Sequence, residues 1–314
     1  MAVILNQYYL QIAMFVLLNA ILGVSIYMTL STGQLSLGNA GFMSIGAYTG
    51  AILTIKAGLP VYLAVPVGGL AASLISIIIG FPALRLTGIY LAIATLGFGE
   101  VVRVIILNLK ITNGALGISG IPTLGLKFGK LLSSLGLSEG IGGLTPQQTS
   151  NLLVLAVLLL VLAFLFFFCV RLNRSRVGRA FAAIKADEPA AEAMGINTTY
   201  YKLLAFALGA FIAGVAGGLS AHLTYFIGPK DFAYHRTVEI LTFAVLGGSD
   251  LIIGPIIGAL LLTLLPELLR SASEYRMMIY GALMVAMMAF RPQGLISEDT
   301  VRFWKGKLKR RIKQ

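Results

Sequence analysis

Long runs of apolar residues, separated by short polar and glycine-rich segments, dominate the hydrophobic pattern of the chain. A helix needs about 20 predominantly apolar residues to cross the hydrocarbon core of a bilayer. The clearest candidate is 151–170, in which only Asn151 falls outside the apolar residue types. Further candidates cover 7–30, 60–81, 88–107, 203–226 and 251–269, and weaker ones cover 38–55 and 277–290. The pattern predicts an all-α polytopic membrane protein with about eight to ten transmembrane or broken helices.

Glycines interrupt the apolar pattern in both halves of the chain. Residues 238–248 would form only about 16 Å of helix at 1.5 Å per residue, which is too short to span a membrane. They end at Gly247 and Gly248 and are followed by 251–269, so we expect half of a broken helix that enters the membrane and returns. Segment 33–50 is a comparable interrupted piece in the N-terminal half. Paired interruptions of this kind indicate a transport path.

The composition excludes several function classes. Apolar residues make up 58% of the chain and charged residues 11%, against about 45–50% and about 25% in soluble domains. Cys169 is the only cysteine, and His222 and His235 are the only histidines, so we expect no intramolecular disulfide and no metal site. The sequence contains no phosphate-binding loop motif and no nucleophile elbow. We therefore expect no enzyme and no cofactor; any ATP hydrolysis would belong to separate subunits.

Positive charge is unevenly distributed along the chain. Of the 24 lysines and arginines, six lie in 171–202 and eight in 291–314. Both segments flank apolar spans, so the positive-inside rule predicts a cytoplasmic loop and a basic cytoplasmic tail. We expect these charges to contact membrane lipid, with no role in nucleic-acid binding. Since 151–170 separates 108–150 from the first basic segment, 108–150 is predicted to be an extracytoplasmic loop.

A few polar residues lie within the predicted spans. Glu100 and Arg103 are three residues apart, a spacing that allows an ion pair on a helix. His222 continues a stripe of small residues at every fourth position, so it should face another helix. Each has a structural alternative, since a paired charge or an interface histidine can serve packing alone. The candidates for a translocation path are Gly38, Asn39, Glu100, Arg103, His222, Gly247, Gly248 and Asp250.

The basic segment 171–202 contains a short predicted helix. Pro189 suits a first helical turn, an Ala- and Glu-rich stretch follows, and Gly195 suits a helix end. The segment is too polar to span a membrane. A charged, helical cytoplasmic loop between two spans is typical of a docking element, and an ordinary solvated connector is the alternative.

Several motifs, in order along the chain, carry a resemblance to a known family. They are Thr32–Phe42 (TGQLSLGNAGF), Gly88–Glu100 (GIYLAIATLGFGE), Ser175–Ala180 (SRVGRA), Glu192–Ile196 (EAMGI), Val245–Gly248 (VLGG) and Phe290–Leu295 (FRPQGL). With these motifs the chain resembles the permease subunits of branched-chain amino acid ABC importers, of the LivM type. The likeness covers roughly residues 20–300.

The resemblance implies a single importer transmembrane domain over 1–314, akin to the many-helix importers of the ribose and vitamin B12 kind, in a bacterial or archaeal cytoplasmic membrane. It implies a sister permease, two ATP-binding subunits and an extracytoplasmic substrate-binding protein as partners. It also implies that 171–202 is the ATPase-coupling loop, with Arg176, Gly178, Arg179, Glu188, Glu192 and Gly195 as its contact residues. Three alternatives remain: the same machinery carrying urea or short amides, a secondary transporter or channel that works without an ATPase, and a purely structural partner in the permease pair.

Overall fold

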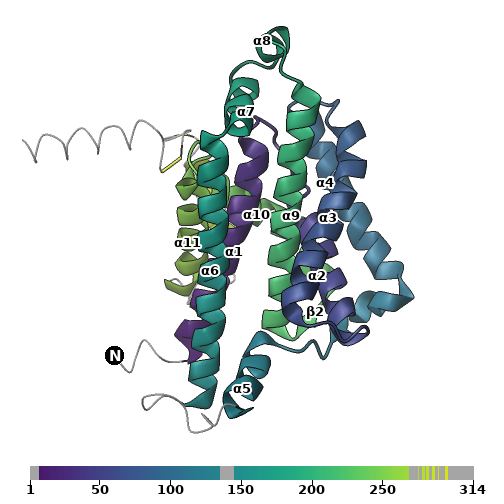
Figure 1. The fold of residues 1–314 in the computed structure, drawn as a ribbon, viewed down its shortest axis with the longest axis vertical. Helices are drawn as coiled ribbons and strands as arrows, with labels where there is room; N and C mark the ends of the chain where they lie inside the picture. Colours follow the sequence, from purple (N-terminus) through teal and green to yellow (C-terminus); the bar gives the residue numbers. More distant parts are fainter. Residues whose placement is uncertain are drawn as a thin grey trace, which may run out of the picture.

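A bundle of eight helices forms the body of the protein in the computed structural model, which describes residues 7–134 and 145–268 and isolated positions between 275 and 295 (Figure 1). The helices are α1 (Gln7–Leu30), α2 (Asn39–Ile55), α3 (Val61–Ala83), α4 (Ile89–Asn108), α6 (Pro146–Arg174), α9 (Thr198–Thr224), α10 (Tyr234–Gly247) and α11 (Ile253–Leu268). Five of them, α1, α3, α4, α6 and α9, are long and apolar enough to cross a membrane. The predicted all-α polytopic architecture is confirmed. Only half of the positions in the span predicted at 277–290, and only Gly294 and Leu295 of the tail predicted at 291–314, are among the described residues.

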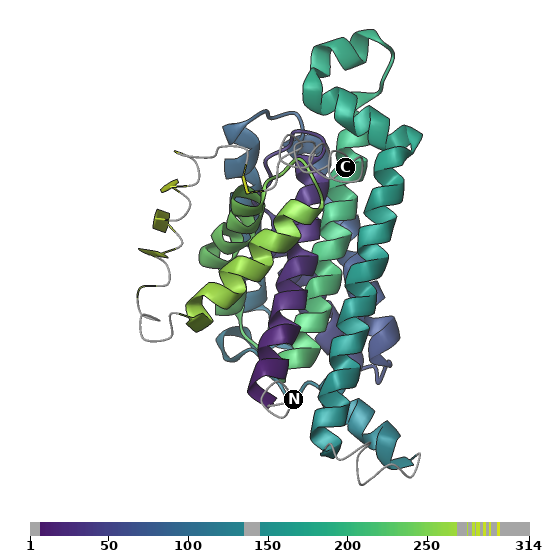
Figure 2. The ribbon, with the colours of Figure 1, turned by 90° about the vertical axis from the view of Figure 1, so that its left-hand side faces the viewer.

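Shorter elements lie at the two ends of the bundle. One end carries α7 (Arg176–Ala186) and α8 (Glu188–Ala193), and the opposite end of α6 carries α5 (Leu124–Ser134) (Figures 1 and 2). The other short elements are the 3-10 turns η1 (Lys110–Thr112), η2 (Gly114–Leu116) and η3 (Pro229–Phe232) and the strands β1 (Ile118–Ser119) and β2 (Phe226–Ile227). The strands pair antiparallel, with Ile118 opposite Ile227. The segment predicted as a loop at 108–150 therefore contains local structure.

Two predicted boundaries need correction. Helix α6 has 29 residues and extends beyond the predicted 151–170 at both ends, and α9 begins at Thr198, five residues before the predicted start. Polar caps explain the early starts: Thr145 and Gln148 form a capping box at α6, and Asn197 accepts a hydrogen bond from the Tyr200 backbone at α9. A helix is not limited to the apolar part of its sequence. The connector predicted at 171–202 is consequently shorter, and only 175–197 lies between the two helices.

Glycines allow α2, α3 and α9 to pack backbone against backbone. A Cβ atom on Gly68 of α3 would lie 2.7 Å from the Gly46 carbonyl oxygen of α2, and one on Gly214 of α9 would lie 2.9 Å from the Gly69 Cα atom. The carbonyl of Gly214 in turn occupies the place of a Cβ on Gly46. Association of membrane helices depends on such close contacts, because lipid tails are as apolar as the side chains. The predicted stripe of small residues that leads to His222 therefore makes real helix contacts, at Gly214.

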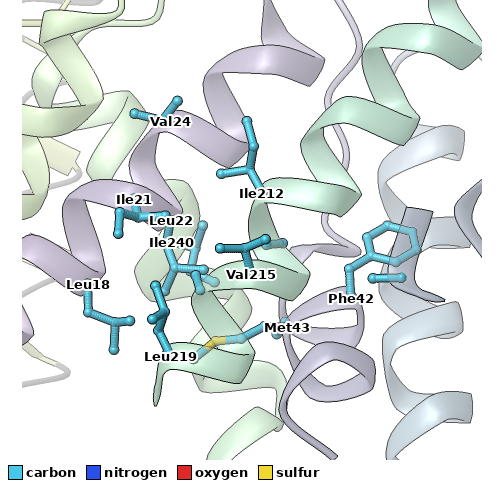
Figure 3. Close-up of a cluster of buried hydrophobic side chains, with 14 of the residues drawn as sticks. Leu18, Ile21, Leu22, Val24, Phe42, Met43, Ile212, Val215, Leu219 and Ile240 are labelled. Atoms are coloured by element: carbon cyan, nitrogen blue, oxygen red, sulfur yellow. The ribbon is translucent and has the colours of Figure 1, made fainter. Parts of the chain in front are cut away.

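The core continues from this contact toward α1 and α10. Large buried side chains from four helices meet there, namely Leu18, Ile21, Leu22, Val24, Phe42, Met43, Ile212, Val215, Leu219 and Ile240 (Figure 3). By contrast, the outer face of α6 presents large apolar side chains outward, with Phe164 69% exposed. Exposed apolar area of this extent suits contact with lipid.

Both predicted interruptions are found in the structure. After α1 the chain turns at Gly33 (φ 76°), continues through 34–38 without regular structure and enters α2. After α9 it turns at Tyr225 (φ 66°) and passes through β2 and η3 before α10 begins, four residues earlier than predicted. Helix α10 ends at Gly247, and α11 begins at Ile253. Each short helix, α2 and α10, therefore follows a long helix through a non-helical stretch.

Candidate functional site

Helix α7 has an apolar inner face and a basic outer face. The Ser175 side chain caps its first turn by accepting a hydrogen bond from the Gly178 backbone at 3.4 Å. Ala180, Phe181 and Ile184 are buried, whereas Arg176 and Arg179 are exposed. Gly178 is required by its surroundings, because a Cβ atom there would overlap the backbone of Leu172 and Asn173. The two predicted arginines are thus presented outward from a tightly seated helix.

Helix α8 confirms the predicted short helix. The Asp187 side chain accepts a hydrogen bond from the Ala190 backbone at 3.0 Å, and Pro189 lies in the first turn. Gly195 ends the helix with φ 82°, and the Ile196 N–H donates back to the Ala191 carbonyl at 3.0 Å. Such left-handed residues close helices, and glycine adopts this conformation without steric penalty.

The two predicted glutamates of this region bond to the chain itself. Glu188 forms an ion pair with Lys202 of α9, whose side chain is almost fully buried. Thr198 donates a hydrogen bond to Glu192 at 2.6 Å. These contacts attach α8 to the start of α9. The most exposed large apolar side chain of the unit is Met194, which is 83% exposed. The sequence did not predict its exposure, because a lone methionine carries no signal of its orientation.

A cavity of about 590 Å³ opens between α7 and the start of α9. Its lining combines arginine, tyrosine and small residues: Arg176, Arg179, Ala180, Gly195, Ile196, Asn197, Tyr200 and Tyr201. Three of the six predicted coupling residues, Arg176, Arg179 and Gly195, therefore meet at one hollow. Guanidinium groups beside aromatic rings suit an acidic partner group.

Gly38 and Asn39 fasten the non-helical stretch before α2. The Asn39 side chain is buried and donates to the Ser25 hydroxyl of α1 at 2.7 Å. The Leu37 N–H donates to the Thr95 hydroxyl of α4 at 2.9 Å. A Cβ atom on Gly38 would lie 3.6 Å from the Phe98 ring. These two path candidates thus lie in a packed junction of α1, α2 and α4.

Glu100 and Arg103 form the predicted ion pair on α4. The Arg103 Nε donates to the Glu100 Oε2 at 2.7 Å. The Arg103 side chain is 28% exposed and the Glu100 side chain 38% exposed. Gly97, one turn earlier, is exposed, and a Cβ atom there would meet nothing within 4 Å. Helix α4 therefore presents an open, partly charged stripe to the outside of the bundle, unlike the wholly apolar side chains on the outer face of α6.

His222 faces another helix, as predicted. It is fully buried, its Nε2 lies 2.9 Å from the Thr54 hydroxyl of α2, and its Nδ1 lies 2.7 Å from the Gly218 carbonyl oxygen. Since a carbonyl can only accept, Nδ1 carries the proton of that bond. These contacts match the alternative of a histidine bonded at a helix interface.

The glycine break places Asp250 beside α7. Gly248 has φ 102°, and a Cβ atom on Gly247 would overlap the backbone of Gly254. The Asp250 Oδ1 lies 3.0 Å from the Lys185 Nζ. The eight path candidates thus occupy separate places: the junction before α2, the α4 stripe, the α2–α9 contact and the turn beneath α7.

A polar network inside the bundle has more members than the sequence alone indicates. Arg236 and Glu239 are three residues apart on α10, a spacing that allows an ion pair. In the structure Arg236 donates to Glu239 at 2.6 Å and to Asn19 of α1 at 2.7 Å, and Asn19 donates to Thr263 of α11 at 2.9 Å. The network joins α1, α10 and α11. Asn19 is far from both Arg236 and Thr263 in the sequence, so no local pattern could have identified these contacts.

Comparison with known proteins agrees with this architecture. Residues 8–288 match the family described as "Branched-chain amino acid transport system / permease component". The high-affinity branched-chain amino acid transport system permease protein LivM of Escherichia coli K12 is 40% identical over 282 residues, which cover 88% of this chain and 66% of that relative. The permease protein LivH of Salmonella typhimurium is 30% identical over 175 residues, 54% of this chain and 56% of the relative. No solved structure matches the chain. The protein therefore belongs to the family of branched-chain amino acid transport permease components.

Proposed function

We propose that the chain is a permease subunit of an ATP-driven, binding-protein-dependent importer of branched-chain amino acids in the bacterial cytoplasmic membrane. Support comes from the family match over most of the chain and from relatives whose names state branched-chain amino acid transport. The chain spans 66% of the length of its LivM relatives. The complete importer would include a sister permease, two ATP-binding subunits and an extracytoplasmic binding protein.

One observation carries the proposal: the unit formed by α7 and α8 projects beyond the bundle while its inner side is anchored to α9 (Figures 1 and 2). Its outer side presents Arg176 and Arg179, which line the cavity, and the exposed Met194. An anchored helix with an exposed basic and apolar face is suited to receive a force from a partner. We assign this unit as the contact for the ATP-binding subunits, on the cytoplasmic side, with α5 on the opposite side.

The α4 stripe is the best candidate for the translocation path. An ion pair at the lipid-facing side of a span is costly, so such residues usually face a cavity or another helix. We propose that the sister permease covers the face with Gly97, Glu100 and Arg103, and that substrate passes between the two permeases. His222 then serves packing, because its ring is already bonded between α2 and α9.

Reconstitution tests the proposal. The chain, its sister permease, the ATP-binding subunits and the binding protein are placed in liposomes, and uptake of radiolabelled leucine is measured with and without ATP. We expect uptake that requires every component. Leucine uptake by the chain alone would instead identify a secondary transporter or channel.

Competition by unlabelled substrates tests the cargo. Leucine, isoleucine and valine should each compete with the label in the complete importer, and urea and short amides should not. ATP-dependent uptake of urea or an amide, with no uptake of leucine, would contradict the substrate assignment while leaving the importer assignment intact.

A further inference from the structure

The last turn of α7 touches two turns that are far apart in the sequence. The Lys185 Nζ lies 3.0 Å from the Asp250 Oδ1, in the turn between α10 and α11. A Cβ atom on Gly33, in the turn after α1, would lie 3.6 Å from the Lys185 Cα atom. One residue of α7 therefore bonds to one interrupted region of the fold and lies beside the other.

The 248–252 turn joins two helices, α10 and α11, whose ends are in close backbone contact. The Gly248 N–H donates to the Ala244 carbonyl and the Gly254 N–H donates to the Leu251 carbonyl, both at 2.9 Å. A Cβ atom on Gly254 would lie 2.9 Å from the Gly247 carbonyl oxygen. The end of α10 and the start of α11 are thus in direct backbone contact. Because the two helix ends touch, we expect a displacement of the turn at Asp250 to reach both helices.

Buried side chains hold helix α7, and therefore Lys185, in place. Phe181 and Ile184 are buried, and the Phe181 ring lies 6.3 Å from the Tyr201 ring of α9, measured between ring centroids. The nearest carboxylate along the chain, Asp187, already caps α8. This leaves the Asp250 carboxylate as the partner that holds the Lys185 ammonium.

The ion pair between Lys185 and Asp250 contributes little to the stability of the fold, and its role is to hold α7 and the turn in a fixed relative position. Its side chains are 35% and 41% exposed, and exposed pairs contribute little to the free energy of folding. Loss of the pair should therefore leave the bundle folded and change only how α7 and the turn move relative to each other.

We propose that Lys185 is a positioning residue that links α7 to the 248–252 turn, so that α7 and the α10–α11 pair shift as one unit during transport. This inference rests on the proposed function, in which the ATP-binding subunits displace α7. It places Asp250 on the coupling side of the protein and removes it from the translocation path.

The test uses the complete reconstituted importer and measures leucine taken up per ATP hydrolysed. Lys185→Ala and Asp250→Ala should each lower this ratio by roughly 2- to 30-fold, the range of coupling residues that contact no ligand. Lys185→Arg should keep the ratio near the wild-type value, and the charge swap Lys185→Asp with Asp250→Lys should restore it. The matched control is Lys56→Ala, which replaces an exposed lysine at the C-terminal end of α2. This variant should have no effect on the ratio.

Two results would overturn the link: single variants with the wild-type ratio, or a charge swap as uncoupled as the single variants. Hydrogen exchange of the purified complex gives a second readout that needs no transport. Lys185→Ala should speed exchange of the 248–254 amides, and unchanged exchange would also overturn the link. If the wild-type importer takes up no leucine, the proposed function fails, and hydrogen exchange alone then decides whether Lys185 holds the turn.

Discussion

The α2–α3–α9 contact and the α7–α8 unit are held together in opposite ways. In the first, glycines bring helix backbones into contact, and Gly46, Gly68 and Gly214 leave no room for a side chain. In the second, side chains connect the parts: Glu188 pairs with Lys202, and Thr198 bonds to Glu192. Backbone contact makes a rigid block, whereas side-chain contacts leave a surface whose position depends on single groups. The block suits a scaffold, and the unit suits a contact with a partner.

The largest expected effect comes from filling the backbone contact. Gly217→Leu would place a side chain where the Met43 carbonyl lies, and overpacking of this kind costs about 3 kcal/mol or more. We expect little folded protein by size-exclusion chromatography in detergent. Gly97→Leu on α4 is the control, because a Cβ atom there meets nothing within 4 Å. If both variants elute like the wild type, the rigid-block description is wrong.

The next effect concerns the exposed face of the α7–α8 unit. Arg179→Glu reverses a charge on the cavity rim without removing a buried group, so the chain should fold normally. In the assembled importer we expect leucine uptake to fall roughly tenfold or more, since like charges at an interface are strongly unfavourable. Lys110→Glu, exposed in η1 near the opposite end, should leave uptake unchanged. Normal uptake in the Arg179 variant would remove this face from the ATPase contact.

A smaller effect should follow when the tether between α8 and α9 is cut. Glu188→Gln leaves the nearly buried Lys202 ammonium without its carboxylate, which should cost about 1–2 kcal/mol after allowing for the partial exposure of Glu188. Adding Lys202→Met should recover part of the loss, because no buried charge then remains. Thermal unfolding of the purified chain gives both values. A double variant less stable than Glu188→Gln would contradict the tether.

The smallest effect is expected on the outer face of α6. Phe164→Leu exchanges one exposed apolar side chain for another, so stability should change by less than about 0.5 kcal/mol. Leu158→Ala on the same helix removes a fully buried side chain and should cost about 2–5 kcal/mol. Equal effects of the two variants would show that the outer face is covered by protein.

Sequence patterns predicted the features that depend on local spacing. The apolar runs located the spans, glycines located the interruptions, the three-residue spacing of Glu100 and Arg103 predicted their pairing, and the small-residue stripe predicted that His222 faces a helix. Each of these rests on helix periodicity, which is visible in one dimension.

Features that depend on tertiary contacts could not be predicted in this way. Asp250 looked like a path residue because a charge in a glycine break is unusual, but its partner Lys185 lies 65 residues away. Glu188 looked like an outward contact, but Lys202 turns it toward α9. The early starts of α6 and α9 were missed because hydropathy does not register capped polar turns. Assignment of a residue to the path or to the coupling surface therefore requires the fold.

The small β1–β2 ribbon also has a mechanical consequence. It fastens the chain just beyond the C-terminal end of α9, where the Ile121 N–H also donates to the Tyr225 carbonyl at 3.2 Å. The other end of α9 carries α8. With 27 residues, α9 is about 40 Å long, so the ribbon and α8 hold its two ends at that separation. A sideways push at the α8 end would therefore act on the whole block that the glycine contacts form from α2, α3 and α9.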